Sequence, residues 1–212
     1  MNKHFFSFMV MTALFAAVLV SNSCNKDDDD NNKGYPVSGT LAGDNAGNYT
    51  LMSVYFDYDK DGGPVWVATV PVTDGKFNIQ LPTPKAGDFY GLDGAPEGVT
   101  VSVEGVKCAD ASFVARVDED DSWGKGFWLQ GESSKGYFFV DYMYVDRDVN
   151  ITGAYEEEGD EYDPGYRDVY DMKLKTGWNA VVYYSQEETD GTRVYTAATD
   201  TIPSGARWID YR

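Results

Sequence analysis

The stretch Lys76–Pro82, "KFNIQLP", decides which class of fold this sequence predicts. Phe77, Ile79 and Leu81 alternate with polar residues, and in an extended chain successive side chains point to opposite faces. A period of two is typical of a strand that packs one face on a core and leaves the other in water. Asp74–Gly75, directly before it, is a two-residue turn signal and predicts a hairpin with the preceding apolar stretch.

The same alternation recurs along most of the chain. It is clear in "VTVSVEGV" (99–106) and in "DVYDMKLKTG" (168–177), and clusters of Gly, Pro and Asp separate such stretches. No stretch beyond the N-terminal segment has the period and the caps of a helix. We therefore expect an all-β fold, an antiparallel β-sandwich over residues 35–212. Strands are predicted at 35–42, 49–58, 64–73, 76–81, 98–107, 111–118, 126–131, 136–145, 147–154, 167–175, 178–186, 191–199 and 206–211.

The number of β modules stays open at this point. The charged segment 118–126 could join two small tandem sandwiches, or it could be a long loop of one large sandwich. The segments "VSGTLAG" (37–43) and "TDGKFNIQLP" (73–82) resemble the opening of transthyretin-like and carboxypeptidase-regulatory-like modules. "YVDRDVNITG" (144–153) and "DMKLKTGWN" (171–179) resemble segments of uncharacterised Bacteroidetes lipoproteins. These resemblances imply an Ig- or transthyretin-like sandwich and carry no known activity.

The N-terminus predicts export and a lipid anchor. Lys3 precedes the apolar run Phe5–Val20, whose 16 residues are fewer than the roughly 20 that span a bilayer. Such a run is typical of a secretory signal. The small residues Ser21–Ser23 and then Cys24 resemble the lipobox of bacterial lipoproteins, which implies that residues 1–23 are removed and Cys24 is acylated, for example with palmitate. Ser21 stands where that motif usually has Leu, so an ordinary secretory signal cleaved near Ser23 stays open.

An acidic segment follows the cysteine. Asp27–Asp30 and the flanking asparagines contain no apolar residue, so residues 24–34 are expected to form a flexible, solvated tether. The order of Cys24, Lys26 and the acidic run resembles the export signal of Bacteroidetes surface lipoproteins. The resemblance implies that the protein is anchored in the outer membrane and faces the cell exterior.

Charge and cysteine content exclude several classes of partner and fold. The chain has 17 Lys and Arg against 35 Asp and Glu, a net charge of −18. Nucleic acids bind largely through basic side chains on phosphates, so we expect no nucleic-acid partner. Neutral sugars and basic peptides stay open. With two cysteines, of which Cys24 is expected to be acylated, no disulfide framework is predicted, and Cys108 is expected to be a small buried apolar residue.

Catalytic signatures are lacking. The one histidine, His4, lies in the predicted signal, which excludes Ser-His-Asp and Cys-His catalysis and the usual zinc sites from the mature chain. A carboxylate pair could still hydrolyse a glycosidic bond. However, the acidic run 155–166 is interpreted as a solvated loop. We expect no enzyme, and a carboxylate-dependent glycoside hydrolase ranks last among the hypotheses.

One segment has the start of a calcium-binding loop. In "DYDKDG" (57–62) the residues Asp57, Asp59 and Asp61 have the spacing of oxygen ligands that hard cations prefer. The twelfth position of the pattern is Ala68 rather than Glu. The alternatives are therefore a calcium site and a polar hairpin turn, and no cofactor is required.

Aromatic residues are abundant and suit both packing and binding. Tyr and Trp combine an apolar ring with a polar edge, as sugar stacking and protein interfaces require. The candidates for ligand stacking lie in expected loops: Trp123, Trp128, Tyr162 and Tyr166. The candidates for the core are Trp66, Trp178 and Trp208. The leading hypothesis is a surface module that binds a glycan or a partner protein, and the alternative is a structural or adhesive surface component.

Overall fold

Strands make up nearly all of the regular structure. The computed structural model describes residues 34–58, 62–92, 94–159, 165–189 and 191–210. Over these residues the chain forms 14 strands and one 3-10 turn, η1 (Ala46–Asn48), which confirms the all-β class. The strands are β1 (Tyr35–Ala42), β2 (Leu51–Tyr58), β3 (Pro64–Pro71), β4 (Lys76–Leu81), β5 (Tyr90–Gly91), β6 (Val99–Val101), β7 (Lys107–Arg116), β8 (Lys125–Ser133), β9 (Gly136–Val145), β10 (Val149–Glu158), β11 (Gly165–Leu174), β12 (Gly177–Glu187), β13 (Arg193–Ala198) and β14 (Arg207–Asp210).

β4 contains the alternating stretch that predicts the fold. Phe77, Ile79 and Leu81 are buried, and the polar residues between them are exposed. Asp74 and Gly75 have φ angles of 51° and 71°, as the predicted two-residue turn requires. The local pattern and the observed strand agree.

The predicted hairpin partner of β4 is wrong. Beyond a single bridge between Thr73 and Lys76, β4 pairs along its length with β1, while β3 pairs with β2. Pairing with β1 places Val37 opposite Ile79, so the buried rows of the two strands join. Burial of apolar area therefore decides the partner, and the turn decides only where the chain reverses.

Two expected elements have different bounds in the structure. Most of the strand expected at 98–107 is the short β6 and a loop, and β7 begins at Lys107. The acidic run 155–166 is not wholly a loop, because Glu156–Glu158 continue β10 and pair with β11 from Arg167 to Gly165. Backbone pairing with β11 extends β10 beyond its apolar pattern, whereas β6 pairs with β10 only from Val99 to Val101 and ends there.

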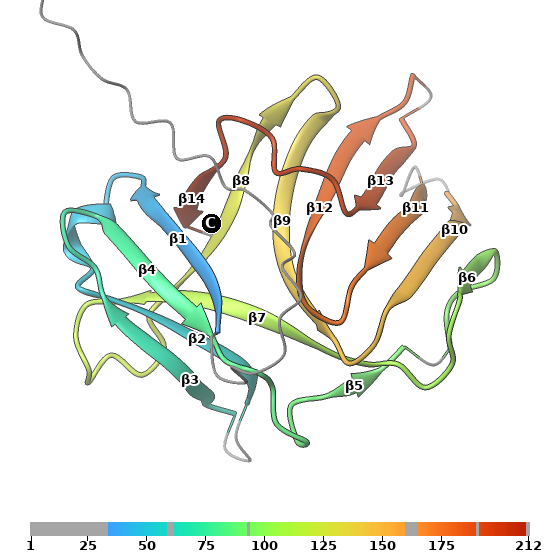
Figure 1. Cartoon of the computed structure of the whole chain (residues 1–212). Helices are drawn as coiled ribbons and strands as arrows, with labels where there is room; N and C mark the ends of the chain where they lie inside the picture. Colours follow the sequence, from blue (N-terminus) through green and yellow to red (C-terminus); the bar gives the residue numbers. More distant parts are fainter. Residues whose placement is uncertain (1–33, 59–61, 93, 160–164, 190, 211–212) are drawn as a thin grey trace, which may run out of the picture. The chain divides into compact units, whose positions relative to one another are not determined.

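Pairing links the strands of the described residues into one open sheet. Its path is β4-β1-β14-β8-β7-β9-β12-β13-β11-β10-β6, with β2 and β5 attached to β7 and β3 attached to β2. Most neighbours are antiparallel, but β1 and β14, and β11 and β13, are parallel, so the predicted antiparallel arrangement holds only in part. β13 lies between β12 and β11, as Figure 1 shows. A strand that enters between two antiparallel strands must run parallel to one of them, and the turn pattern of the sequence does not reveal this insertion.

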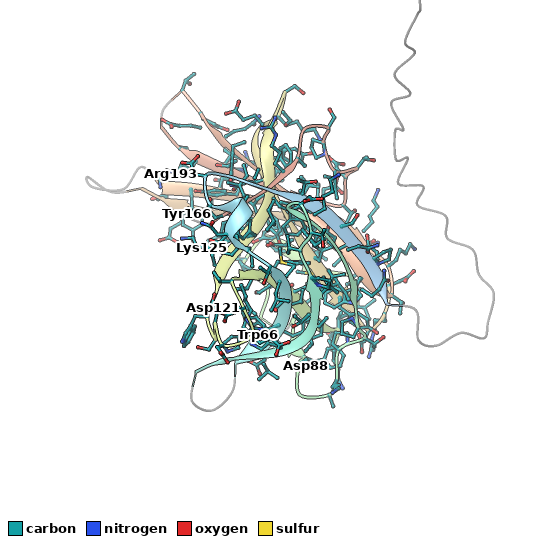
Figure 2. All side chains as sticks on the ribbon, turned by 90° about the vertical axis from the view of Figure 1, so that its left-hand side faces the viewer. Trp66, Asp88, Asp121, Lys125, Tyr166 and Arg193 are labelled. Atoms are coloured by element: carbon teal, nitrogen blue, oxygen red, sulfur yellow. The ribbon has the colours of Figure 1, made fainter. Side chains whose placement is uncertain are left out.

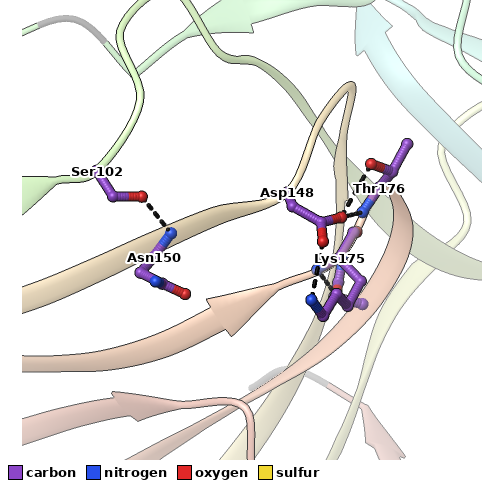
Figure 3. Close-up of polar contacts among 6 residues, drawn as sticks. Ser102, Asp148, Asn150, Lys175 and Thr176 are labelled. Atoms are coloured by element: carbon purple, nitrogen blue, oxygen red, sulfur yellow. Dashed lines mark hydrogen bonds and ion pairs between the residues drawn. The ribbon is translucent and has the colours of Figure 1, made fainter.

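Polar side chains hold the turn between β11 and β12. The carboxylate of Asp148 accepts hydrogen bonds from Lys175 Nζ at 2.8 Å and from Thr176 N and Oγ1 at 2.8 and 3.0 Å (Figure 3). Asn179 Oδ1 accepts a bond from Lys175 N at 2.8 Å, and its Nδ2 donates to Lys175 O at 2.7 Å. The bonds to Asp148, led by that from Lys175, lower the pKa of Asp148 to about 2. These contacts fix the turn that joins β11 to β12. β13 enters between these two strands from their opposite end.

β7 and β8 share one edge of β9. Residues 136–140 of β9 pair with β8, and residues 142–145 pair with β7. Asp141 lies between these two ladders, while its other edge pairs with Val181 of β12. We call this place, where β7 and β8 separate along β9, the junction.

The two faces of β9 carry different cores. Phe138, Val140 and Tyr142 point to one side and belong to the larger core, to which β1, β2, β4, β7, β8, β12 and β14 contribute. Met143 and Val145 point to the other side and belong to a smaller core. We name these the Phe138 face and the Asp141 face. The buried residues of the smaller core are Val106, Cys108, Met143, Val145, Val149, Ile151, Met172, Leu174, Val181 and Ala197.

The predicted core residues divide between these environments. Trp208 and Trp178 pack in or against the larger core, as predicted, but Trp66 does not belong to it. Cys108 is fully buried in the smaller core, which confirms its predicted role, and burial, followed by Asp110 and Asp146, raises the pKa of its thiol to about 12.

Candidate ligand-binding surface

The predictions for the N-terminus lie outside the described residues. This applies to the signal peptide (1–23), to Cys24 and to the tether (24–34) apart from Gly34. Across the part of the chain that the structure describes, no helix is long and apolar enough to cross a membrane.

The candidate calcium loop is described only at its ends. Asp57 is exposed near the end of β2, whereas Asp59 and Asp61 lie outside the described residues. Within the described ranges, no three acidic, Cys or His side chains are grouped so that they could hold a metal ion.

A buried cation holds the loop 117–124, which carries Trp123. Arg116 is 5% exposed, and its Nε donates to Asp121 O at 2.6 Å while its Nη2 donates to Glu119 O. Its guanidinium lies 4.9 Å from the centre of the Trp66 ring, a cation–π contact. Trp66 therefore supports Arg116 instead of filling the core, and Figure 2 shows Trp66 and Asp121 on the same side of the molecule.

Asp121 fixes the loop from within. Its carboxylate accepts hydrogen bonds from Gly124 N at 2.9 Å and Val117 N at 3.3 Å, and these bonds lower the pKa of Asp121. Gly124 has a φ of 56°, and a Cβ there would lie 2.5 Å from Val114 Cγ1. The loop therefore lies directly on β7 and presents Trp123, with 62% of its surface exposed.

Trp128 belongs to a row of three stacked rings that crosses β8, β9 and β12. The Trp128 and Phe139 rings are 5.5 Å apart at 24°, and the Phe139 and Tyr183 rings are 4.9 Å apart at 5°. Phe139 and Tyr183 are directly paired across the strands. We name Trp128, Phe139 and Tyr183 the ring stack. It lies on the Asp141 face, and Trp128 is 40% exposed.

Asp141 stands at the junction on the same face as Phe139. Its side chain is half-buried, and no hydrogen-bond donor or cation among the described residues contacts its carboxylate. Burial, and then the neighbouring Asp110, raise its pKa to about 6. A carboxylate with this much enclosure and no donor has unused capacity to accept hydrogen bonds.

Asp110 continues this surface on β7, where it pairs with Met143 of β9. The Tyr90 hydroxyl, on β5, donates to Asp110 Oδ2 at 2.5 Å. Enclosure by the surrounding protein raises the pKa of Asp110, although the bond from Tyr90 lowers it. Asp110 nevertheless remains accessible to solvent, and Tyr90 is 42% exposed. Both groups can therefore meet a ligand.

The other predicted stacking residue on a strand lies elsewhere. The Tyr166 ring, on β11, is 6.1 Å from the Tyr155 ring on β10, and a hydrogen bond with Glu157 is the main cause that raises the pKa of Tyr166 to about 12. Tyr162 lies outside the described residues. Trp123, Trp128 and Tyr166 thus occupy a loop and two different strands.

Four residues of this surface were not among those predicted from the sequence: Phe139, Tyr183, Asp110 and Asp141. Phe139 and Tyr183 are 44 residues apart and become neighbours only through the register of β9 with β12. A signal for Asp141 was nevertheless present. In "YFFVDYMYV" (137–145) it is the single charged residue of an otherwise apolar and aromatic strand. A charged side chain is costly to bury in such a strand, so packing alone does not explain Asp141.

The arrangement combines two kinds of recognition group. The ring stack offers apolar surface, and the carboxylates of Asp141 and Asp110 offer acceptors beside it. Comparison of the chain with models of protein families, with curated proteins and with solved structures finds no match in any of the three. The function proposed below is therefore argued from the chemistry of this surface.

Proposed function

We propose that this chain is a non-catalytic protein of the cell surface that binds glycans through its Asp141 face. In this proposal Cys24 carries the lipid, residues 24–34 form the tether, and the body is a β-sandwich on the exterior of the outer membrane. The signal-like N-terminus and the acidic run after Cys24 support the location. The all-β body supports a rigid binding module.

The observation that carries the binding proposal is the position of Asp141 beside the ring stack. Sugar rings have apolar C–H faces that pack on aromatic rings and hydroxyl groups that donate to carboxylates. The ring stack and the donor-free carboxylate of Asp141 present both requirements on one face. Trp128 was already a stacking candidate, and the other residues of the site extend it.

Lack of catalysis remains part of the proposal. The mature chain would contain no histidine, and a pair of carboxylates is the route by which it could hydrolyse a glycosidic bond. Incubation of each bound polysaccharide with the protein, followed by a reducing-end assay, is expected to show no new chain ends. Cleavage that is lost in Asp110→Asn or Asp141→Asn would contradict this part.

The binding test uses the full-length protein in a zwitterionic detergent, because sugar-based detergents would compete. Affinity electrophoresis against dextran, galactomannan and xyloglucan, with calcium or with EDTA, is expected to reveal saturable binding to at least one. Phe139→Leu preserves apolar volume but removes the stacked ring, and we expect it to weaken binding at least tenfold. Asp171→Asn is the matched control, because Asp171 is exposed and alternates with Tyr170 on β11.

The outcomes distinguish the two exposed aromatic surfaces. Loss of binding in Trp123→Ala with full binding in Phe139→Leu would move the site to the loop 117–124 and contradict the ring-stack site. Loss of binding with EDTA would support the predicted calcium site at Asp57, Asp59 and Asp61. Absence of binding to every polysaccharide would contradict glycan recognition, and a partner protein would then be sought on the cell surface.

A structural or adhesive component is the second candidate, and the open sheet favours it. Among the described strands, β3, β4 and β6 each pair on one side only, and Val65 of β3 is 48% exposed. Unpaired strand edges allow association with another chain. Concentration-dependent oligomers that disappear in Val65→Lys would support this function, and a monomer at all concentrations would contradict it.

A further inference from the structure

The junction determines which side chains surround a ligand at the Asp141 face. Val140 still pairs with Leu129 of β8, and Tyr142 already pairs with Ala111 of β7. Asp141 has no partner residue on that edge, and Trp128 and Asp110 lie on the two strands that separate beside it. The half-buried carboxylate is thus placed between a ring of the stack and a second carboxylate.

Among the described residues, no cation forms an ion pair with Asp110 or Asp141. The ion pairs between described residues are Lys135–Asp200, Arg147–Asp146, Arg167–Glu156 and Lys175–Asp148, and none involves Asp110 or Asp141. Burial, and then Asp110, raise the pKa of Asp141, as is expected where two carboxylates lie near one another. A ligand that carried its own carboxylate or sulfate would add to this repulsion in a partly desolvated place.

Tyrosines lie near these carboxylates. The hydroxyl of Tyr90 donates to Asp110, that of Tyr170 bonds with Asp168, and burial, followed by Asp141 and Asp110, raises the pKa of Tyr183. A tyrosine hydroxyl both donates and accepts, whereas a carboxylate only accepts. A sugar hydroxyl can donate to a carboxylate and accept from another donor at the same time, so an uncharged polyol fits this set of groups. A cationic ligand would also fit the carboxylates, and the test below distinguishes the two.

We propose that Asp141 makes this surface selective for uncharged glycans over glycans that carry carboxylate or sulfate groups. The inference rests on the proposed function and adds the class of ligand to it. Asp141 accepts hydrogen bonds from the hydroxyls of a sugar that packs against the ring stack, and it repels an anionic substituent at the same position. Asp141 is thus the specificity-determining residue of the site.

The test compares polysaccharides that differ only in charge. The pairs are dextran with carboxymethyl dextran, dextran with dextran sulfate, and methyl-esterified with de-esterified homogalacturonan. Binding of the full-length protein is measured at pH 7.5 and at two salt concentrations. We expect at least one neutral member to bind at least tenfold more tightly than its anionic counterpart, a difference that exposed surface charge alone would lose at high salt.

Asp141→Asn assigns the selectivity to this residue. The amide keeps an acceptor but removes the charge, so we expect neutral binding to weaken while anionic binding strengthens, and the neutral-to-anionic ratio to fall at least fivefold. Asp171→Asn should keep the wild-type ratio. Near-UV circular dichroism checks that each variant is folded, and Asp141→Ser provides a second variant without charge.

Each result has a defined meaning. A neutral-to-anionic ratio unchanged in both Asp141 variants, with binding intact and still dependent on Phe139, would overturn the inference but leave glycan binding standing. Tighter binding of the anionic members by wild-type protein would also overturn it. Absence of binding to every polysaccharide would overturn the proposed function, and with it this inference. Displacement of a bound neutral polysaccharide by polylysine at high salt would identify a cationic ligand and reject selectivity for uncharged glycans.

Discussion

Successive residues of β9 point alternately to its two faces, and the faces differ in whether they leave a polar group without a hydrogen-bond donor. On the Phe138 face, Phe138 and Val140 are buried, and the ring of Tyr142 packs against those of Tyr35 and Phe113 at 6.0 and 5.5 Å. On the Asp141 face, a carboxylate without a donor stands beside stacked rings that remain partly exposed. The comparison indicates that the Phe138 face serves packing, whereas the Asp141 face, which also carries Met143 and Val145 of the smaller core, gives up stability at Asp141, where a ligand would bind.

The largest expected effect comes from truncating adjacent residues on opposite faces. Phe138→Ala removes a fully buried ring and should lower the free energy of unfolding by about 3–5 kcal/mol. Phe139→Ala removes a half-buried ring and should lower it by about 1–2 kcal/mol, because less apolar area returns to water. Urea denaturation of the full-length variants at pH 7 measures both losses. Equal losses would show that the two faces contribute alike and would remove the distinction.

A smaller effect of opposite sign is expected at Asp141. Its folded-state pKa of about 6 lies above the usual value of 3.8, so ionisation destabilises the fold as pH rises from about 4 to 6 and fully above that. Asp141→Asn should therefore stabilise the protein at pH 7 by about 3 kcal/mol, since the pKa is raised by about two units and one unit corresponds to ~1.4 kcal/mol. The gain should disappear near pH 4. Denaturation curves at pH 7 and pH 4 measure this gain in stability. A variant less stable than wild type at pH 7 would contradict a destabilising role of the ionised Asp141 carboxylate.

The smallest effect is expected at Asp148, which sharpens the contrast between a satisfied and an unsatisfied aspartate. Its folded-state pKa of about 2 lies below the usual 3.8, so its bonds to Lys175 and Thr176 stabilise the fold above pH 3.8. This contribution is lost as pH falls towards 2. Asp148→Asn should lower the melting temperature slightly at pH 7, and the difference should shrink between pH 4 and pH 3. A difference that grows on acidification would contradict the role of these bonds.

The residues of the candidate site differ in how far the sequence revealed them. Trp128 could be selected because a tryptophan near a glycine-rich loop is conspicuous, but its partner Phe139 looked like any aromatic residue of a strand. The role of Trp66 was mistaken, because its contact with Arg116 joins residues 50 positions apart. The separation of β7 from β8 at Asp141 could not be read locally, since neither strand contains an unusual turn at that point.

The sequence by itself determined the properties that depend on neighbouring residues or on composition. Alternation with a period of two predicts strands, and the two positive φ angles at Asp74 and Gly75 follow from a local turn signal. The strong negative charge and the single histidine also follow from composition alone. Only the tertiary structure decided that β4 joins β1, that β13 enters between β12 and β11, and that Asp141 lies beside the ring stack. These features depend on strand register and on burial across long separations, and a pattern read along the chain contains neither.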